Sequence, residues 1–271
     1  MMVHRSRPTR RQQLRLHTGV VRVFPLKDDI PSQRTPFVTV GLIAACVLIY
    51  FWQASLGPQE GAYAVYSYGF IPAVLLTGAE LPSELAVLPP AATLLTSMFL
   101  HGGFMHLAGN MLYLWVFGNN IEDSMGHGRF LLFYLLCGVA AAFAQALPDP
   151  SSEIPMIGAS GAISGVLGAY LVLFPHARVH VLIPFGFLLL HTIRAGWLLG
   201  FWFVFQLASG LLSSSAEGGV AFWAHVGGFV AGMALIFVMR DRRRPIWRSP
   251  RPSRGRSYMP RVPRRPPGPW G

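Results

Sequence analysis

Six apolar segments run through the sequence, and each is long enough to approach the thickness of a lipid bilayer. A membrane-spanning helix needs about 20 mostly apolar residues. The chain is 52% hydrophobic and only 12% charged, and the charged faces of a soluble helical bundle are missing between the apolar runs. The pattern predicts an all-α polytopic membrane protein with six transmembrane helices. The predicted spans are residues 37–56, 104–120, 129–147, 157–174, 196–212 and 219–239.

Basic residues predict the orientation of these spans. If both ends of the chain lie on one side, all 22 Lys and Arg residues fall on that side. Because basic loops stay in the cytoplasm, both termini are expected there. The net charge of +11 follows from this asymmetry and does not indicate a nucleic-acid partner. The lipid bilayer is the expected surrounding, in the inner cell membrane of a bacterium or, as the alternative, in the mitochondrial inner membrane.

The spans divide the chain into three parts. Residues 1–35 are predicted to be a mostly irregular, basic cytoplasmic tail, residues 36–240 the helical domain, and residues 241–271 a disordered tail rich in Arg and Pro. The C-terminal tail either binds anionic lipid headgroups or only anchors the topology. Residues 58–103 form a long outside loop after the first helix. Its apolar composition suggests that it lies against the membrane or partly within it.

Ser160 is the first of several polar residues that point to chemistry, because polar groups inside spans are costly. It lies in Gly158-Ala159-Ser160-Gly161, where an apolar helix is predicted to begin. The unpaired N–H groups and the positive dipole end of such a helix would stabilise an oxyanion beside the serine. Taken alone, the motif is explained at least as well by close helix packing through its small residues.

His225 strengthens the chemical interpretation of Ser160. It lies about six residues into the last predicted span, roughly 9 Å below the outer surface, and Ser160 reaches a similar depth. A histidine at that depth needs a hydrogen-bond partner. Gly228 and Gly232 form a GxxxG pattern that would let this span pack closely on the glycine face beside Ser160. The arrangement predicts a Ser-His pair.

His106 and Asn110 are a second candidate pair. They are four residues apart and therefore share one face of a helix. Both can donate hydrogen bonds from the outer half of their span. With the backbone N–H of Ser160 they would complete an oxyanion hole. The alternative is a satisfied His-Asn pair in the helical core.

Together these elements resemble the rhomboid family of intramembrane serine proteases. The resemblance covers approximately residues 36–240. It rests on three motifs in this order: His106-x-x-x-Asn110, then Gly158-x-Ser160-Gly161, then Ala224-His225-x-x-Gly228-x-x-x-Gly232. Each motif alone is weak, but their order, spacing and predicted topology are specific in combination.

The resemblance implies a six-helix rhomboid bundle and an endopeptidase that cleaves single-pass transmembrane proteins near the outer end of their helix. By resemblance, Ser160 and His225 are the catalytic dyad, and His106 and Asn110 belong to the oxyanion hole. Glu122 is expected to be a structural hydrogen-bonding residue at the cytoplasmic end of the second span. The structural residues expected near the site are Gly158, Gly161, Gly228 and His101. No metal and no cofactor are implied, and the oligomeric state is left open.

Two positions depart from the pattern of the family. Many members carry a Trp-Arg pair in the first loop, and residues 58–103 contain none. Some members place a tyrosine one turn after the nucleophile, stacked on the histidine, and this chain has Ser164 there. In the fifth span, Phe201, Trp202 and Phe205 either form a lateral gate for substrate or face lipid.

Other intramembrane chemistries lack the residues that they require. A zinc protease needs His-Glu-x-x-His, and the segment between His101 and His106 has no glutamate. No span holds an aspartate in its interior, and the only lysine, Lys27, lies in the N-terminal tail. Two alternatives remain besides a protease. One is a non-enzymatic rhomboid-like protein that binds helices without cutting them, and the other is a transporter or channel, for which inverted repeats would be expected.

Overall fold

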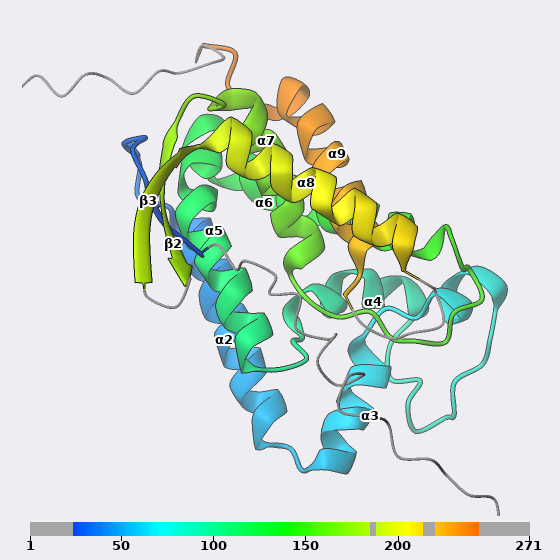
Figure 1. Ribbon diagram of the computed structural model, residues 1–271. Helices are drawn as coiled ribbons and strands as arrows, with labels where there is room; N and C mark the ends of the chain where they lie inside the picture. The colour runs from blue at the N-terminus through cyan, green and yellow to red at the C-terminus, as the bar shows by residue number, and fades with distance from the viewer. Residues whose placement is uncertain (1–23, 185–187, 214–219, 244–271) are drawn as a thin grey trace, which may run out of the picture.

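The structure is a computed structural model that describes residues 24–184, 188–213 and 220–243 (Figure 1). The predicted basic tails fall largely on residues 1–23 and 244–271, which lie outside the described residues. Helices make up most of the described chain. The α-helices are α2 (Phe37–Ser55), α3 (Pro58–Tyr68), α4 (Pro90–Thr96), α5 (Phe104–Met125), α6 (His127–Ala146), α7 (Ser160–Leu173), α8 (Ala195–Leu212) and α9 (Phe222–Met239).

Local sequence explains where several helices begin and end. α2 starts directly after Pro36, and α3 and α4 carry Pro58 and Pro90 in their first turns, where a missing N–H costs nothing. Gly126 separates α5 from α6 with a φ of 83°, a conformation that side chains with a Cβ rarely adopt. This single glycine therefore allows the chain to reverse between two long helices.

Four helices are long and apolar enough to cross a membrane by length and composition: α2, α6, α8 and α9. α5 has 22 residues, but its last turns include Asn120, Glu122 and Asp123. α7 has only 14 residues, and at about 1.5 Å per residue it spans about 21 Å. A bilayer core is about 30 Å thick. The chain is thus a mostly helical membrane protein, and the predicted count of six spanning helices is not confirmed by helix length.

A three-stranded antiparallel sheet was not expected from the sequence. Its strands are β1 (Phe24–Asp28), β2 (Arg178–Pro184) and β3 (Leu188–Arg194), in the order β1-β2-β3. The prediction of an all-α fold is wrong in this part. Val179 and Val181 are buried while His180 between them is exposed, which is the alternation of a half-buried strand.

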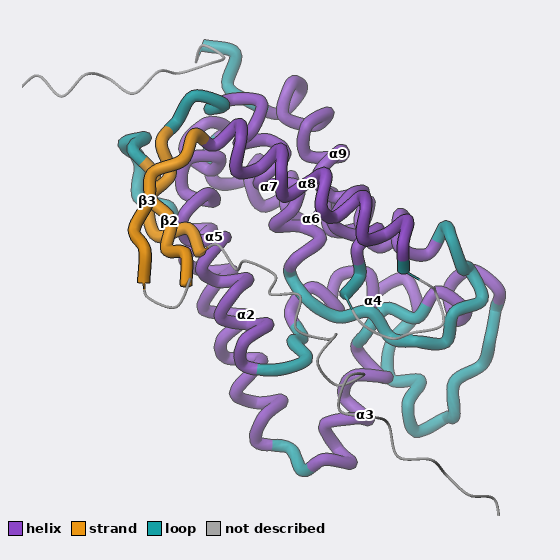
Figure 2. The backbone as a smooth tube through the Cα atoms, viewed as in Figure 1, coloured by secondary structure: helices purple, strands orange, loops and turns teal. Residues whose placement is uncertain are grey.

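The sheet and the segment after α2 lie at opposite ends of the helical bundle (Figure 2). We call these the sheet end and the loop end. Residues 58–103 were predicted to be a long loop, but they contain α3, α4 and two short helical turns, η1 (Ala73–Thr77) and η2 (Ser97–Phe99). An isolated bridge between Phe70 and Met156 ties this segment to the chain just before α7.

α7 is the central helix of the bundle and packs against α5, α6, α8 and α9 (Figure 1). Its residues from Gly161 to Tyr170 are all buried. α9 crosses it very closely, because a methyl group on Gly228 would collide with the carbonyl oxygen of Gly161, and one on Gly232 with that of Gly165. Small residues at such crossings let two backbones approach where side chains would otherwise separate them. The predicted close contact of these two glycine faces is therefore present.

Candidate active site

Ser160 is the first residue of α7, at the loop end of the bundle. Gly158 precedes it with a φ of 124°, so the helix begins three residues later than the predicted span. A Cβ on Gly158 would lie 2.7 Å from Cε1 of His106 and 3.8 Å from Oγ of Ser160. The missing side chain of this glycine is what allows the imidazole of α5 and the hydroxyl of α7 to lie side by side.

His225 reaches the same region from the first turn of α9. The preceding residue, Ala224, borders Gly161, since a Cβ on that glycine would lie 3.8 Å from the Ala224 Cβ. His225 also interacts electrostatically with His106 of α5. Ser160 and His225 are both half-buried. The described structure shows no direct hydrogen bond between them, and such bonds are often long in enzymes without substrate.

The imidazole of His225 is held from α8. Its Nδ1 lies 2.8 Å from Oε1 of Gln206, and its ring lies against the indole of Trp202, with 5.7 Å between the ring centres. Gln206 was not singled out from the sequence. The sequence nevertheless contains a signal for it: Gln206 is a lone amide in an otherwise apolar stretch, and polar residues in such stretches are usually functional.

His106 and Asn110 lie on the same face of α5, and they differ in burial. His106 is exposed, and its Nδ1 accepts a hydrogen bond of 3.3 Å from the backbone N–H of Gly102. Asn110 is only 8% exposed, and its Nδ2 has no acceptor among the described residues. A buried amide donor without a partner is costly. Asn110 therefore holds hydrogen-bonding capacity that the protein itself does not use.

His101 lies three residues before the start of α5, next to His106. It is 1% exposed, its ring stands edge-on to that of His106 at 5.2 Å, and its Nδ1 lies 3.1 Å from the Phe99 carbonyl oxygen. Its backbone N–H donates to Oε1 of Gln53 in α2. These contacts place His101 as a support for the His106 ring. Among the described residues, no group of three or more His, Cys, Asp or Glu side chains is placed to hold a metal ion.

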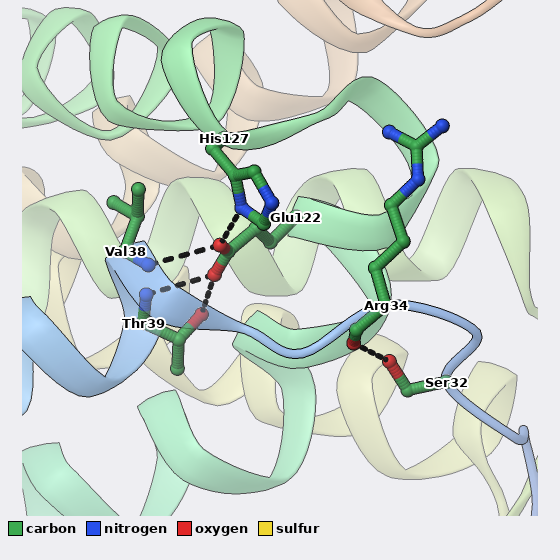
Figure 3. A network of polar contacts seen from close by, with 6 residues as sticks. All are labelled: Ser32, Arg34, Val38, Thr39, Glu122 and His127. Carbon is green, nitrogen blue, oxygen red and sulfur yellow. Dashed lines mark hydrogen bonds and ion pairs between the residues drawn. The ribbon is translucent and has the colours of Figure 1, made fainter.

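A separate polar cluster lies at the sheet end, around the buried carboxylate of Glu122 (Figure 3). Its Oε1 accepts from the backbone N–H of Val38 at 2.9 Å, and its Oε2 accepts from the N–H and hydroxyl of Thr39 at 2.8 and 2.6 Å. Nδ1 of His127 lies 2.5 Å from Oε1. Glu122 thus caps the first turn of α2, as expected for a structural hydrogen-bonding residue.

Asp28 forms a second buried cluster at the sheet end. Its carboxylate accepts hydrogen bonds from the Asn120 amide of α5 and the Tyr170 hydroxyl of α7, each at 2.5 Å. Burial raises the pKa of Asp28 to about 6. The side chain thereby fixes β1 to two helices of the bundle, at the opposite end of α7 from Ser160.

Comparison with known proteins identifies the family of the chain. The family model of the Rhomboid domain matches residues 90–242, more than half of the 271-residue chain. The rhomboid protease GluP of Bacillus subtilis (strain 168) is 39% identical over 142 residues, which are 52% of this chain and 25% of GluP. RHOMBOID-like protein 5 of Arabidopsis thaliana is 33% identical over 146 residues, 54% of this chain and 43% of that protein.

A mitochondrial relative is more distant. The human presenilin-associated rhomboid-like protein, mitochondrial, is 29% identical over 169 residues, 57% of this chain and 41% of that protein. The chain thus spans less than half of the length of each of these relatives. The matched region contains α5 through α9, and with them each of the polar side chains gathered at the loop end. By the extent of the family match, this chain belongs to the rhomboid family.

Proposed function

We propose that this chain is an intramembrane serine endopeptidase that cleaves transmembrane proteins near the outer end of their spanning helix, with Ser160 as nucleophile and His225 as base. One observation carries the proposal. Ser160 is the first residue of the buried helix α7, and α9, which carries His225, crosses α7 so closely that the contact is made through glycines. Membership in a family whose relatives include a named rhomboid protease supports the hydrolase class.

The proposed reaction uses the polar groups of the loop end. The Ser160 hydroxyl attacks the scissile carbonyl while His225 takes its proton. His225 then gives that proton to the leaving amine, and the acyl-enzyme is hydrolysed by a water that His225 activates. The carbonyl oxygen becomes negatively charged in each tetrahedral intermediate. Three donors would stabilise it: the Ser160 N–H, His106 and the unpaired amide of Asn110.

The short central helix gives this reaction access to water. In the proposed topology six helices span the membrane, with α5 and α7 added to the four long apolar helices. α7 would then begin below the outer surface, because its length of about 21 Å falls short of the hydrocarbon thickness of about 30 Å. Ser160 would lie at the bottom of a recess open to the outside. Both termini would be cytoplasmic, in a bacterial inner membrane or, as the alternative, a mitochondrial one.

Two measurements on detergent-purified protein test the proposal. The wild-type chain should react with a fluorophosphonate and should cut single-span reporters that carry small residues near the outer end of the helix. The Ser160→Ala protein should do neither and should keep the thermal stability of the wild type. Equal labelling of both proteins would remove Ser160 as the nucleophile. Reporter binding without labelling or cleavage would favour a non-enzymatic rhomboid-like protein.

A further inference from the structure

α8 contributes one buried polar side chain to the bundle. Gln206 is 6% exposed, whereas Phe201 and Phe205 of the same helix are 75% and 42% exposed. Burying an amide without a partner costs free energy. In this structure its oxygen lies 2.8 Å from Nδ1 of His225. The burial of Gln206 is therefore linked directly to the orientation of one imidazole.

The direction of this hydrogen bond decides which nitrogen of His225 is basic. With the amide oxygen of Gln206 facing the ring, as it does in this structure, Nδ1 of the imidazole is the donor, because an amide oxygen carries no proton. In a neutral imidazole the other nitrogen, Nε2, then has a free lone pair. A general base needs this state on the nitrogen that faces the nucleophile. In this orientation Gln206 favours the tautomer in which His225 can accept the proton of Ser160.

α7 does not supply the aromatic ring that some family members place against the histidine. Ser164 stands where some family members have a stacking tyrosine, and its hydroxyl donates to the Ser160 carbonyl oxygen at 2.6 Å. The ring next to His225 comes instead from Trp202 of α8, which also packs on Phe229 of α9. Trp202 and Gln206 are four residues apart and therefore lie on the same face of α8.

We propose that Gln206 is a positioning residue for His225, and that α8 sets both the tautomer and the ring plane of the base. The inference rests on the proposed function, since it assigns a role in the same proton transfer. It extends the dyad by a neutral third member, which accepts from Nδ1 without placing a charge in the membrane. It also makes the reactivity of Ser160 depend on the position of α8.

Three variants test this role. Gln206→Leu keeps the size of the side chain but removes the acceptor. Gln206→Glu keeps the acceptor and adds a charge. The matched control is Gln145→Leu, because Gln145 of α6 also accepts a hydrogen bond from the start of α9, from the backbone N–H of Ala224 at 3.1 Å, without contacting the imidazole. The rate of fluorophosphonate labelling is measured against pH for each purified protein, beside its thermal stability.

Gln206→Leu should label about 10- to 100-fold more slowly at every pH, as expected when the partner that orients a working histidine is lost. Gln206→Glu should recover most of the rate at alkaline pH. Its acid limb should move to higher pH, because a carboxylate on Nδ1 stabilises the imidazolium. Among the described residues, the ionisable side chain that interacts electrostatically with His225 is His106. None of the three variants changes His106. Gln145→Leu should lose stability and keep the wild-type pH profile.

The proposal is overturned if Gln206→Leu labels within twofold of the wild type. It is also overturned if Gln206→Glu is as slow as Gln206→Leu and its acid limb does not move. If Gln206→Leu does not fold, the position of the acid limb in Gln206→Glu decides alone. Failure of the proposed function gives a different result, since the wild type itself would then label no faster than Ser160→Ala.

Discussion

The two ends of the helical bundle differ in how completely their polar side chains are hydrogen-bonded within the protein. At the sheet end, the carboxylates of Glu122 and Asp28 accept hydrogen bonds from backbone, amide, hydroxyl and imidazole donors. At the loop end, the Asn110 amide is buried without an acceptor among the described residues, and the His106 ring is exposed. Both ends are built on the same two helices, α5 and α7.

If the proposed function holds, this difference separates stability from reactivity along one pair of helices. A carboxylate whose hydrogen bonds are all made within the protein stabilises the folded state and has no capacity left for a ligand. An unpaired buried donor costs stability, and that cost is recovered when a ligand supplies the acceptor. We therefore expect substitutions at the loop end to change the rate, and substitutions at the sheet end to change the free energy of unfolding.

The largest expected effect is at the proposed dyad. Ser160→Ala and His225→Ala should each lower reporter cleavage by more than about a thousandfold, because nucleophile and base act as a unit. Thermal stability should stay near that of the wild type for Ser160→Ala. The double variant should be no slower than either single variant. A double variant that is much slower than both would mean that the two residues act independently.

Smaller losses are expected at the two proposed oxyanion donors. Asn110→Ala and His106→Ala should each lower the cleavage rate by about 10- to 1000-fold, with reporter binding nearly unchanged. Asn110→Ala should also raise thermal stability slightly, because it removes a buried donor that has no partner in the described structure. If instead thermal stability falls and the cleavage rate does not change, these side chains serve the fold as those of the sheet end do. The proposed difference between the two ends is then wrong.

The reverse outcome is expected for Glu122. Glu122→Ala removes the acceptor of the Val38 and Thr39 N–H groups and should lower the free energy of unfolding by about 2 kcal/mol. The rate per folded molecule should stay within a few-fold of the wild type. Denaturant or thermal unfolding in detergent, with fluorophosphonate labelling on the same samples, measures both. A large loss of labelling at full stability would show that the sheet end communicates with the nucleophile.

The smallest effect concerns Asp28 and pH. Its pKa in the folded protein is raised from 3.8 to about 6, so the folded state binds the proton more tightly than the unfolded state does. Its contribution to stability is therefore full below the unfolded pKa and is lost as the pH rises through about 6. Between pH 5 and pH 7 the loss should be on the order of 1 kcal/mol.

Asp28→Asn removes this titration and serves as the matched variant. The difference in unfolding free energy between the wild type and Asp28→Asn should change with pH over that range. Labelling of Ser160 should show no matching change. A stability difference that does not vary with pH would mean that the carboxylate titrates normally and that its burial is incomplete in solution.

The sequence allowed prediction of the parts of the fold that depend on local pattern. α2, α6, α8 and α9 begin and end within a few residues of the predicted spans, because each is a long apolar run. α5 extends past the predicted end to Met125, where Gly126 stops it. The start of α7 was placed too early, because the backbone at Gly158 turns away from helical geometry to admit the His106 ring.

Features that depend on distant partners could not be predicted in the same way. The strand β1 exists because it pairs with β2, and no local signal in Phe24–Asp28 identifies that partner. Ser160, His106 and His225 were singled out because polar side chains are conspicuous in apolar runs, and their assignment as catalytic residues stays a prediction. The role of Gln206 depends on the rotation of α8 against α9, which the sequence of α8 alone does not determine.

The sheet has a consequence for the order of events during synthesis. The backbone N–H of Arg178, at the start of β2, donates to Oδ1 of Asp29, directly after β1, across 149 residues of chain. At ribosomal speeds of about 5–20 residues per second, roughly 7 to 30 s pass between the synthesis of β1 and that of its partner strand. Tyr170, which binds Asp28, is also made late in this interval. The strand β1 is thus made well before the parts of the chain that fix it in place.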